Sequence, residues 1–189
     1  AKGLDFQNVG MVGIVSADVT LNIPDYRSAE RTFQLITQAA GRAGRGDEVG
    51  RVVVQTYTPD NYAIRFGAAQ DYDSFYQKEI QGRSWMLYPP FGDIIQVVFS
   101  SKSENECRSA ASCWEEELKR LMQGKGSVLP PQKMNVPGDR KIFKEYILIK
   151  SPKGMRNLYM AHIRKLKDGV GRRKYSVMVD VNPYSMWRS

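Results

Sequence analysis

The sequence contains few of the residue types that most often build catalytic or metal sites. It has one histidine, His162, and two cysteines, Cys107 and Cys113. A single histidine excludes a histidine-rich metal site. The cysteines stand six positions apart in a segment of helical pattern, a spacing that suits neither a disulfide framework nor a metal clip. We therefore predict that this chain holds no metal and that it works in a reducing, cytoplasmic setting.

Long hydrophobic runs are also missing. The longest apolar stretches, Met11 to Val15 and Val52 to Val54, are far shorter than the roughly 18 residues that a membrane span requires. We expect no membrane-spanning segment and no membrane partner. The chain begins at Ala1 with neither an initiator methionine nor an apolar leader, so we expect it to be a piece of a longer protein.

A phosphate-binding loop is the third absence. The chain has no Gly-x-x-x-x-Gly-Lys-Ser/Thr sequence, and the stretch Gly124-Lys125-Gly126-Ser127 has the wrong spacing to be one. Asp47 and Glu48 directly follow a glycine-arginine turn and do not end a strand, so they do not form a magnesium site. The chain is expected to lack the cradle for a nucleotide.

The first part of the chain has the pattern of an α/β crossover unit. The total of 189 residues, 42% hydrophobic and 25% charged, allows one large or two small globular domains. Apolar runs over residues 9–15 and 51–57 predict buried parallel strands. Between them, apolar positions at spacings of three and four predict a helix over residues 29–40. Strand, helix and strand in this order favour one crossover of a parallel sheet.

The remaining chain predicts a helical connector and then a second domain. Helical patterns over 62–70 and 72–86 end before Pro89-Pro90, because proline blocks further helix. After the prolines, the pattern predicts a strand over 93–99 and a helix over 104–122. An extended piece begins at Val128, and a strand over 142–149, a helix over 154–166 and a strand over 175–181 follow. This βαββαβ order is that of ferredoxin-like domains. We divide the chain into 1–60, 61–90 and 91–187.

Positive charge is concentrated in the second half of the chain. Residues 1–90 have nine Lys or Arg against ten Asp or Glu, whereas residues 91–189 have nineteen against ten. The segment 140–174 alone is net +10. Such a field attracts a polyanion, and nucleic acid is the natural partner, although a solvated surface is the alternative. The predicted DNA-binding residues are Arg140, Lys141, Lys144, Lys150, Lys153, Arg156, Arg164, Lys165, Arg172, Arg173 and Lys174.

One motif points to nucleotide chemistry. Residues 38–45 read Gln-Ala-Ala-Gly-Arg-Ala-Gly-Arg at the end of the predicted helix over 29–40. A rigidly held arginine can stabilise the charge that develops on phosphates during hydrolysis by bidentate contacts. A glycine-arginine surface turn or a nucleic-acid loop would have a similar composition, so the motif alone leaves the choice open.

The residues around this motif resemble the PriA-type replication-restart helicases of superfamily 2. The motif itself is similar to helicase motif VI, and Lys2-Gly3-Leu4-Asp5-Phe6 is similar to motif V. Further matching residues are Ala17-Asp18, Pro24-Asp25-Tyr26-Arg27, Glu30-Arg31, Gln34, Phe75-Tyr76, Glu79, Arg83, Tyr88-Pro89-Pro90-Phe91 and Val179-Asp180-Val181-Asn182-Pro183. The resemblance covers most of residues 1–100, and after that it rests on element order and the last of these motifs.

The resemblance implies fold and site roles. The fold would be α/β: part of a RecA-like second helicase lobe, then a helical connector and a ferredoxin-like, S10-like C-terminal domain. Arg45 would be the arginine finger, with Arg42 and Gln38 in support. Gly3 and Asp5 would belong to motif V, which couples the nucleotide state to the bound DNA strand. The resemblance therefore makes Gly3, Asp5 and Arg45 the expected nucleotide-binding residues.

The resemblance also implies partners and an activity. The longer protein would be an ATP-dependent 3′-to-5′ DNA helicase that uses ATP and Mg²⁺ and holds zinc through a cysteine array that this chain lacks. It would bind forked or single-stranded DNA, primosome proteins and single-strand-binding protein at stalled replication forks. The chain alone would bind DNA without hydrolysing ATP. Two alternatives stay open: a non-enzymatic nucleic-acid-binding module, and another superfamily 2 translocase that shares motif VI.

Three aromatic residues have predicted positions in the second domain. Trp114 lies on the apolar face of its predicted helix, so we expect it in the core. Tyr146 and Tyr159 lie within the basic segment, where they could stack on bases. For Tyr146 the strand pattern favours core packing.

Overall fold

The fold is mixed α/β, as the sequence predicts. The computed structural model describes residues 10–43, 50–122, 124–134, 142–169 and 174–186. The chain divides into two compact units, Ala1–Gly82 and Arg83–Ser189, and each is described by itself below. This division falls within the segment 61–90. None of the described helices is long and apolar enough to cross a membrane.

The first unit contains the predicted crossover. Strands β1 (Met11–Ile14) and β2 (Arg51–Val54) pair in parallel, and helix α2 (Ser28–Ala40) connects them. A short helix α1 (Asp18–Leu21) and helix α3 (Tyr62–Ala68) complete the unit together with most of α4 (Tyr72–Trp85). Ile36 of α2 and Ile64 of α3 are buried together against the inner sides of the two strands. The structure confirms the predicted strand, helix and strand.

The prediction that these two strands are buried is wrong. Their burial alternates, so only every second side chain faces α2 and the other face is open. On that open face Met11 is 65% exposed, Val15 78% and Val53 54%. A parallel sheet normally has both faces covered. The described residues cover only one face of this sheet, because one crossover helix can lie on only one side of the two strands.

A buried carboxylate fixes the turn after β2 in the first unit. Asp18 accepts hydrogen bonds from the backbone N–H of Tyr57 at 3.1 Å and from the hydroxyl groups of Thr56 and Thr58 at 3.0 and 3.2 Å. Burial raises the pKa of Asp18, but these hydrogen bonds outweigh it, and the net pKa lies below its usual value of 3.8. The Asp18 carboxylate therefore ties the start of α1 to a segment distant in sequence.

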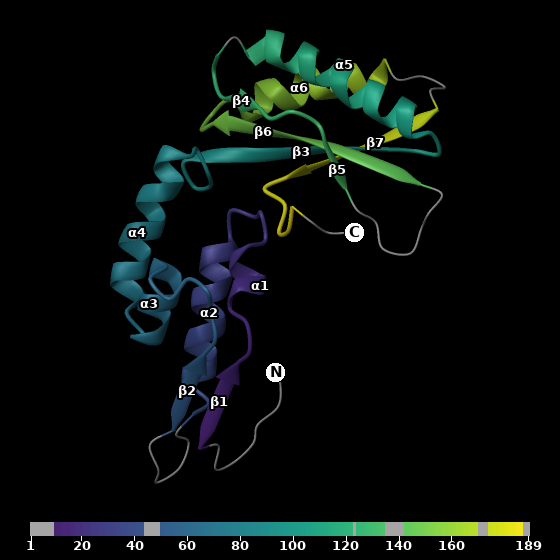
Figure 1. Cartoon of the computed structure of the whole chain (residues 1–189). Helices are drawn as coiled ribbons and strands as arrows, with labels where there is room; N and C mark the ends of the chain where they lie inside the picture. Colours follow the sequence, from purple (N-terminus) through teal and green to yellow (C-terminus); the bar gives the residue numbers. More distant parts are fainter. Residues whose placement is uncertain (1–9, 44–49, 123, 135–141, 170–173, 187–189) are drawn as a thin grey trace. The chain divides into compact units, whose positions relative to one another are not determined.

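The second unit is built on an antiparallel sheet with two helices on one face (Figure 1). Its elements in chain order are β3 (Gly92–Ser101), α5 (Glu104–Met122), β4 (Ser127–Val128), β5 (Gln132–Met134), β6 (Phe143–Pro152), α6 (Arg156–Asp168) and β7 (Tyr175–Val181). The strand order is β4-β6-β3-β7, and β5 also pairs with β6. The long strands and both helices agree with the sequence prediction.

Alternation along the strands gives this sheet two different faces. Phe99 pairs with Val177 on β7, and Val97 pairs with Ile147 on β6 and with Val179 on β7. These side chains pack under α5 and α6 in one core, in which the ring of Phe99 lies edge-on to the ring of Trp114, 5.3 Å between centroids. Trp114 is 2% exposed, which confirms its predicted place. The intervening residues of each strand point to the opposite face, because side chains of a strand alternate.

Candidate nucleic-acid interface

The described part of the glycine-arginine motif lies where α2 ends. Gln38 is exposed on the last turn of α2, and Arg42 is half-buried in the turn that follows. Arg45, Gly3 and Asp5 lie outside the described residues. The nucleotide roles of all five positions stay predictions.

The basic segment separates into two groups in the folded domain. Lys144 and Lys150 belong to β6, while Arg156, Arg164 and Lys165 belong to α6. Lys153 and Lys174 are exposed outside these helices, near the ends of strands. The remaining predicted DNA-binding residues, Arg140, Lys141, Arg172 and Arg173, lie outside the described residues. The charge that forms one cluster in the sequence is therefore distributed over opposite sides of the sheet.

The cations of β6 lie on the sheet face away from the helices. Lys144 and Lys150 share the alternation of Tyr146 and Leu148, whereas Ile147 and Ile149 pack in the core under the helices. The ammonium group of Lys150 lies 4.3 Å from the ring centroid of Tyr88, a cation–π contact that holds it at the surface. Both lysines are half-buried on this face.

The cations of α6 lie on its outer side. Tyr159 and Ile163 of α6 are buried, while Arg164 and Lys165 are exposed. Lys165 lines a shallow hollow of about 330 Å³ between α5 and α6, together with Glu117, Leu118, Arg120, Leu121, His162 and Leu166. Because an acidic residue shares this hollow, its net field is weaker than the sequence of α6 suggests. At the start of α6, the Arg156 guanidinium lies 3.8 Å from the Asp93 carboxylate.

Tyr146 packs in the core, as its strand pattern predicts, and the alternative that Tyr146 and Tyr159 stack on bases is wrong. Tyr146 and Tyr159 are each 1% exposed. The Tyr146 hydroxyl donates to the Gln132 side-chain oxygen at 2.7 Å, and the Tyr159 hydroxyl donates to the Lys125 carbonyl. Burial raises the pKa of Tyr146 to about 12. Both rings pack inside the domain, because the strand and the helix turn these positions inward.

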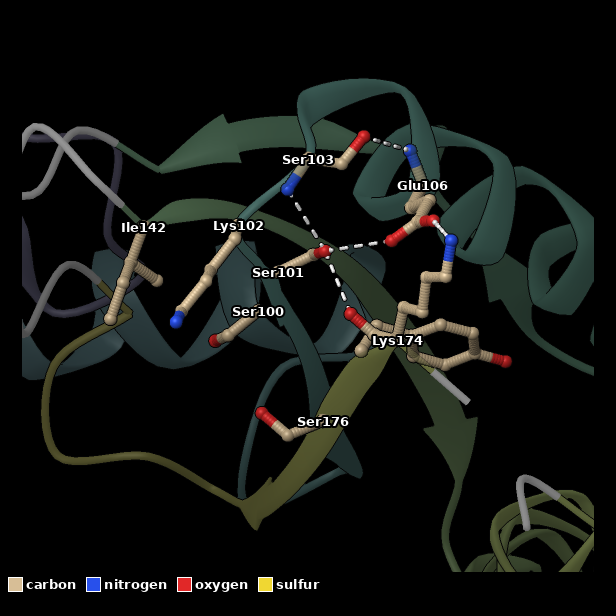
Figure 2. Close-up of a pocket in the computed structure, with 9 residues that line it drawn as sticks. Ser100, Ser101, Lys102, Ser103, Glu106, Ile142, Lys174 and Ser176 are labelled. Carbon is tan, nitrogen blue, oxygen red and sulfur yellow. Dashed lines mark hydrogen bonds and ion pairs between the residues drawn. The ribbon is translucent and has the colours of Figure 1, made fainter. Parts of the chain in front are cut away.

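Sequence reasoning missed a polar hollow at the end of the sheet (Figure 2). It has a volume of about 750 Å³ and is lined by Ser100, Ser101, Lys102, Ser103, Glu106, Ile142, Lys174, Tyr175 and Ser176. Lys102 lies outside the basic segment 140–174, and the serines of β3 and β7 do not belong to any recognisable sequence motif. Only strand pairing brings these residues together, so no local sequence signal could have identified the hollow.

The stretch Gly124-Lys125-Gly126-Ser127 is a turn after α5 that ends at Ser127, the first residue of β4. Gly126 has φ of +95°, and a β-carbon at this position would lie 2.3 Å from the Lys150 carbonyl oxygen. Glycine is therefore required here to let two backbone segments approach. Among the described residues, no group of three or more His, Cys, Asp or Glu side chains could hold a metal ion.

A family of known proteins matches the second unit of the chain. Residues 85–184 match the family described as the primosomal protein N C-terminal domain. Replication restart protein PriA of Bacillus subtilis (strain 168) is 37% identical over 188 residues, 98% of this chain and 23% of that protein. The protein of the same name in Chlamydia muridarum (strain MoPn / Nigg) is 34% identical over 187 residues, 97% of this chain and 24% of that protein.

This chain corresponds to only part of each of these relatives. The chain spans about a quarter of their length, 23% and 24%. Among solved structures, the de novo designed protein Foldit4 matches 49% of this chain and 97% of its own with a TM-score of 0.39 and 10% sequence identity. A TM-score of 0.39 is too low to support a conclusion about the fold of this chain.

Proposed function

The chain belongs to the family of the primosomal protein N C-terminal domain, and from this premise we propose that it binds DNA as the C-terminal region of a replication-restart helicase. One observation supports the DNA-binding role most directly. The predicted basic residues that the structure describes are exposed or half-buried on a folded domain, whereas Tyr146 and Tyr159 of the same segment are buried. A surface of this kind binds phosphates by charge and does not depend on base identity.

We assign the two units to two parts of such a helicase. The strand, helix and strand of the first unit would be part of the RecA-like second lobe, with Gln38 and Arg42 in its motif VI. The second unit would be the ferredoxin-like, S10-like domain. The strand order β4-β6-β3-β7 supports this assignment. Helix α6 connects β6 to β7, and these two strands lie on either side of the antiparallel strand β3, which is the split βαβ arrangement.

The longer protein would couple ATP hydrolysis to 3′-to-5′ movement along forked or single-stranded DNA in the cytoplasm. The phosphate-binding loop for ATP, the Mg²⁺ ligands and the zinc-binding cysteines would lie in other segments of the longer protein, since the present sequence has no phosphate-binding loop, and Gly3, Asp5 and Arg45 would contribute to the nucleotide site from this chain. Primosome proteins and single-strand-binding protein would be its partners, as expected of proteins named for replication restart.

Two measurements on the purified chain test this proposal. Binding of single-stranded and forked DNA should weaken steeply as salt increases, because each phosphate contact releases counterions. An affinity that is the same at low and moderate salt would contradict a mode based on phosphates. ATP hydrolysis in the presence of DNA should stay at background, and turnover at a normal helicase rate would contradict the assignment to an incomplete motor.

A further inference from the structure

The hollow at the end of the sheet combines elements that are distant in sequence. Ser100 near the end of β3 pairs with Ser176 near the start of β7 and with Lys144 on β6. The neighbours Phe99 and Val177 pack under the helices, so Ser100, Ser176 and Lys144 point to the opposite face. Adjacent strands lie about 4.8 Å apart. Two hydroxyl groups and one ammonium-bearing side chain thus form a row across three strands.

Some polar groups of the hollow already have partners within the domain. The Ser101 hydroxyl donates to the Lys174 carbonyl at 2.8 Å and accepts from the backbone N–H of Ser103 at 3.1 Å. The Ser103 hydroxyl accepts from the backbone N–H of Glu106 at 3.4 Å. The Glu106 carboxylate lies 3.4 Å from the ammonium of Lys174, which neutralises the one acid of the hollow. These groups form its wall.

Other polar groups of the hollow are available to a ligand. Figure 2 shows the side chains of Ser100, Ser176 and Lys102 lining the same space, with Ile142 beside Lys102. Within the described residues, none of these three polar side chains makes a hydrogen bond or an ion pair. Lys102 and Ser176 are exposed and Ser100 is half-buried. Two hydroxyl donors and one cation that have no partner among the described residues therefore line one concave surface.

We propose that this hollow is a subsite for a backbone phosphate of a DNA strand. The Lys102 ammonium would neutralise the phosphate charge, and the hydroxyl groups of Ser100 and Ser176 would donate hydrogen bonds to its non-bridging oxygens. Charge-assisted hydrogen bonds of this kind are the strong ones. The inference rests on the DNA binding proposed above and specifies where on the sheet domain the strand lies.

The size and the surroundings favour a strand over an isolated anion. The volume of about 750 Å³ falls within the range of about 300–1,000 Å³ that is typical of pockets for larger ligands, and it exceeds the need of a single phosphate group. Ile142 is 39% exposed and provides an apolar wall for a sugar or a base. Lys144 follows along the row, so a second phosphate would meet another cation.

Variants of the whole chain separate this subsite from general charge. Lys102→Ala tests the cation, and the double variant Ser100→Ala/Ser176→Ala tests the hydroxyl groups. The matched controls, Lys119→Ala and Ser109→Ala, remove the same groups from exposed positions on α5, on the helical side of the sheet. Affinity for a short oligo-dT is measured by fluorescence anisotropy over a series of salt concentrations, and circular dichroism verifies that each variant is folded.

Charge and hydroxyl contacts should give different signatures. Lys102→Ala should weaken binding about threefold to tenfold and reduce the slope of log affinity against log salt by about 0.7, the value for one single-strand phosphate contact. The double serine variant should weaken binding by about the same factor and leave the slope unchanged, because no charge is removed. The two α5 controls should change affinity less than about twofold.

The outcomes distinguish the subsite from the proposed function. If the unaltered chain binds oligo-dT but both test variants behave like their controls, the subsite is wrong and DNA binding stands. If the unaltered chain does not bind, the proposed function fails together with the subsite. Inorganic phosphate and thymidine monophosphate, titrated at constant ionic strength, should show no saturable binding where oligo-dT saturates. Saturable, Lys102-dependent binding of inorganic phosphate would assign the hollow to a free anion and overturn the assignment to DNA.

Discussion

The side-chain amide of Asn182 donates a hydrogen bond to the carboxylate of Asp93 at 2.7 Å, across 89 residues of sequence. The Asn182 side-chain oxygen also accepts from the backbone N–H of Ile94 at 2.9 Å. One side chain thus joins the chain after the last strand of the second unit to the start of its first strand. Asn182 has φ of +51°, a left-handed conformation that asparagine tolerates better than most residues.

Asn182→Ala should destabilise the second unit by about 2 kcal/mol, because two hydrogen bonds are lost and alanine is strained at positive φ. Urea unfolding followed by tryptophan fluorescence measures the change, since Trp114 lies in the core of this unit. Asn157→Ala, at an exposed position on α6, is the control. Equal unfolding midpoints for the two variants would mean that the Asn182 contacts do not stabilise the domain.

Asp18→Asn should remove a pH-dependent stabilisation from the first unit. Because the folded pKa of Asp18 lies below its usual value of 3.8, its contribution is present above that pH and is lost as the pH falls through the lowered pKa. Hydrogen exchange of the first unit should therefore be faster in the variant at neutral pH and similar to that of the unaltered chain at acid pH. Asp60→Asn, at an exposed position, should exchange like the unaltered chain throughout. Equal protection of the Asp18 variant at neutral pH would contradict the anchor role.

Arg45→Ala, made in the full-length protein to which this chain is proposed to belong, should lower DNA-stimulated ATP hydrolysis by about 10³-fold or more, the usual effect of losing an arginine finger. DNA binding should be nearly unchanged, because the resemblance assigns Arg45 to the nucleotide. Steady-state ATPase assays and anisotropy measure the two properties. Arg65→Ala, at an exposed position on α3, serves as control, and unchanged turnover in the Arg45 variant would refute the assignment.

Val53→Lys should reduce self-association of the chain. The open face of β1 and β2 exposes apolar side chains in a two-stranded parallel sheet, and a lysine on such a strand opposes pairing with another copy. Sedimentation velocity at increasing protein concentration measures the effect. Val19→Lys adds the same charge at an exposed position of α1 and should leave association unchanged. If the unaltered chain is monomeric at every concentration, the prediction is wrong.

The elements were predictable because their signals are local. Helix α5 was predicted from its apolar face, which includes Trp114, and β7 from a run of alternating residues, and the structure confirms the bounds of both. The cationic character of residues 140–174 was also visible from composition. The core packing of Tyr146, which its strand pattern favours, is also confirmed. Its strand pattern does not specify that β5 and Met134 cover its ring on the face away from the helices.

The amino-acid sequence by itself determined the order of helices and strands, the family, and the excess of positive charge, because each depends on neighbouring residues or on short motifs. The tertiary structure alone decided which cations share a face of the sheet and that Lys102 and Ser176 line the same hollow. Strand register fixes those relationships, and register depends on the packing of distant side chains under α5 and α6. The described part of the glycine-arginine motif lies at the end of α2 and in the turn that follows it, and its nucleotide role stays a prediction.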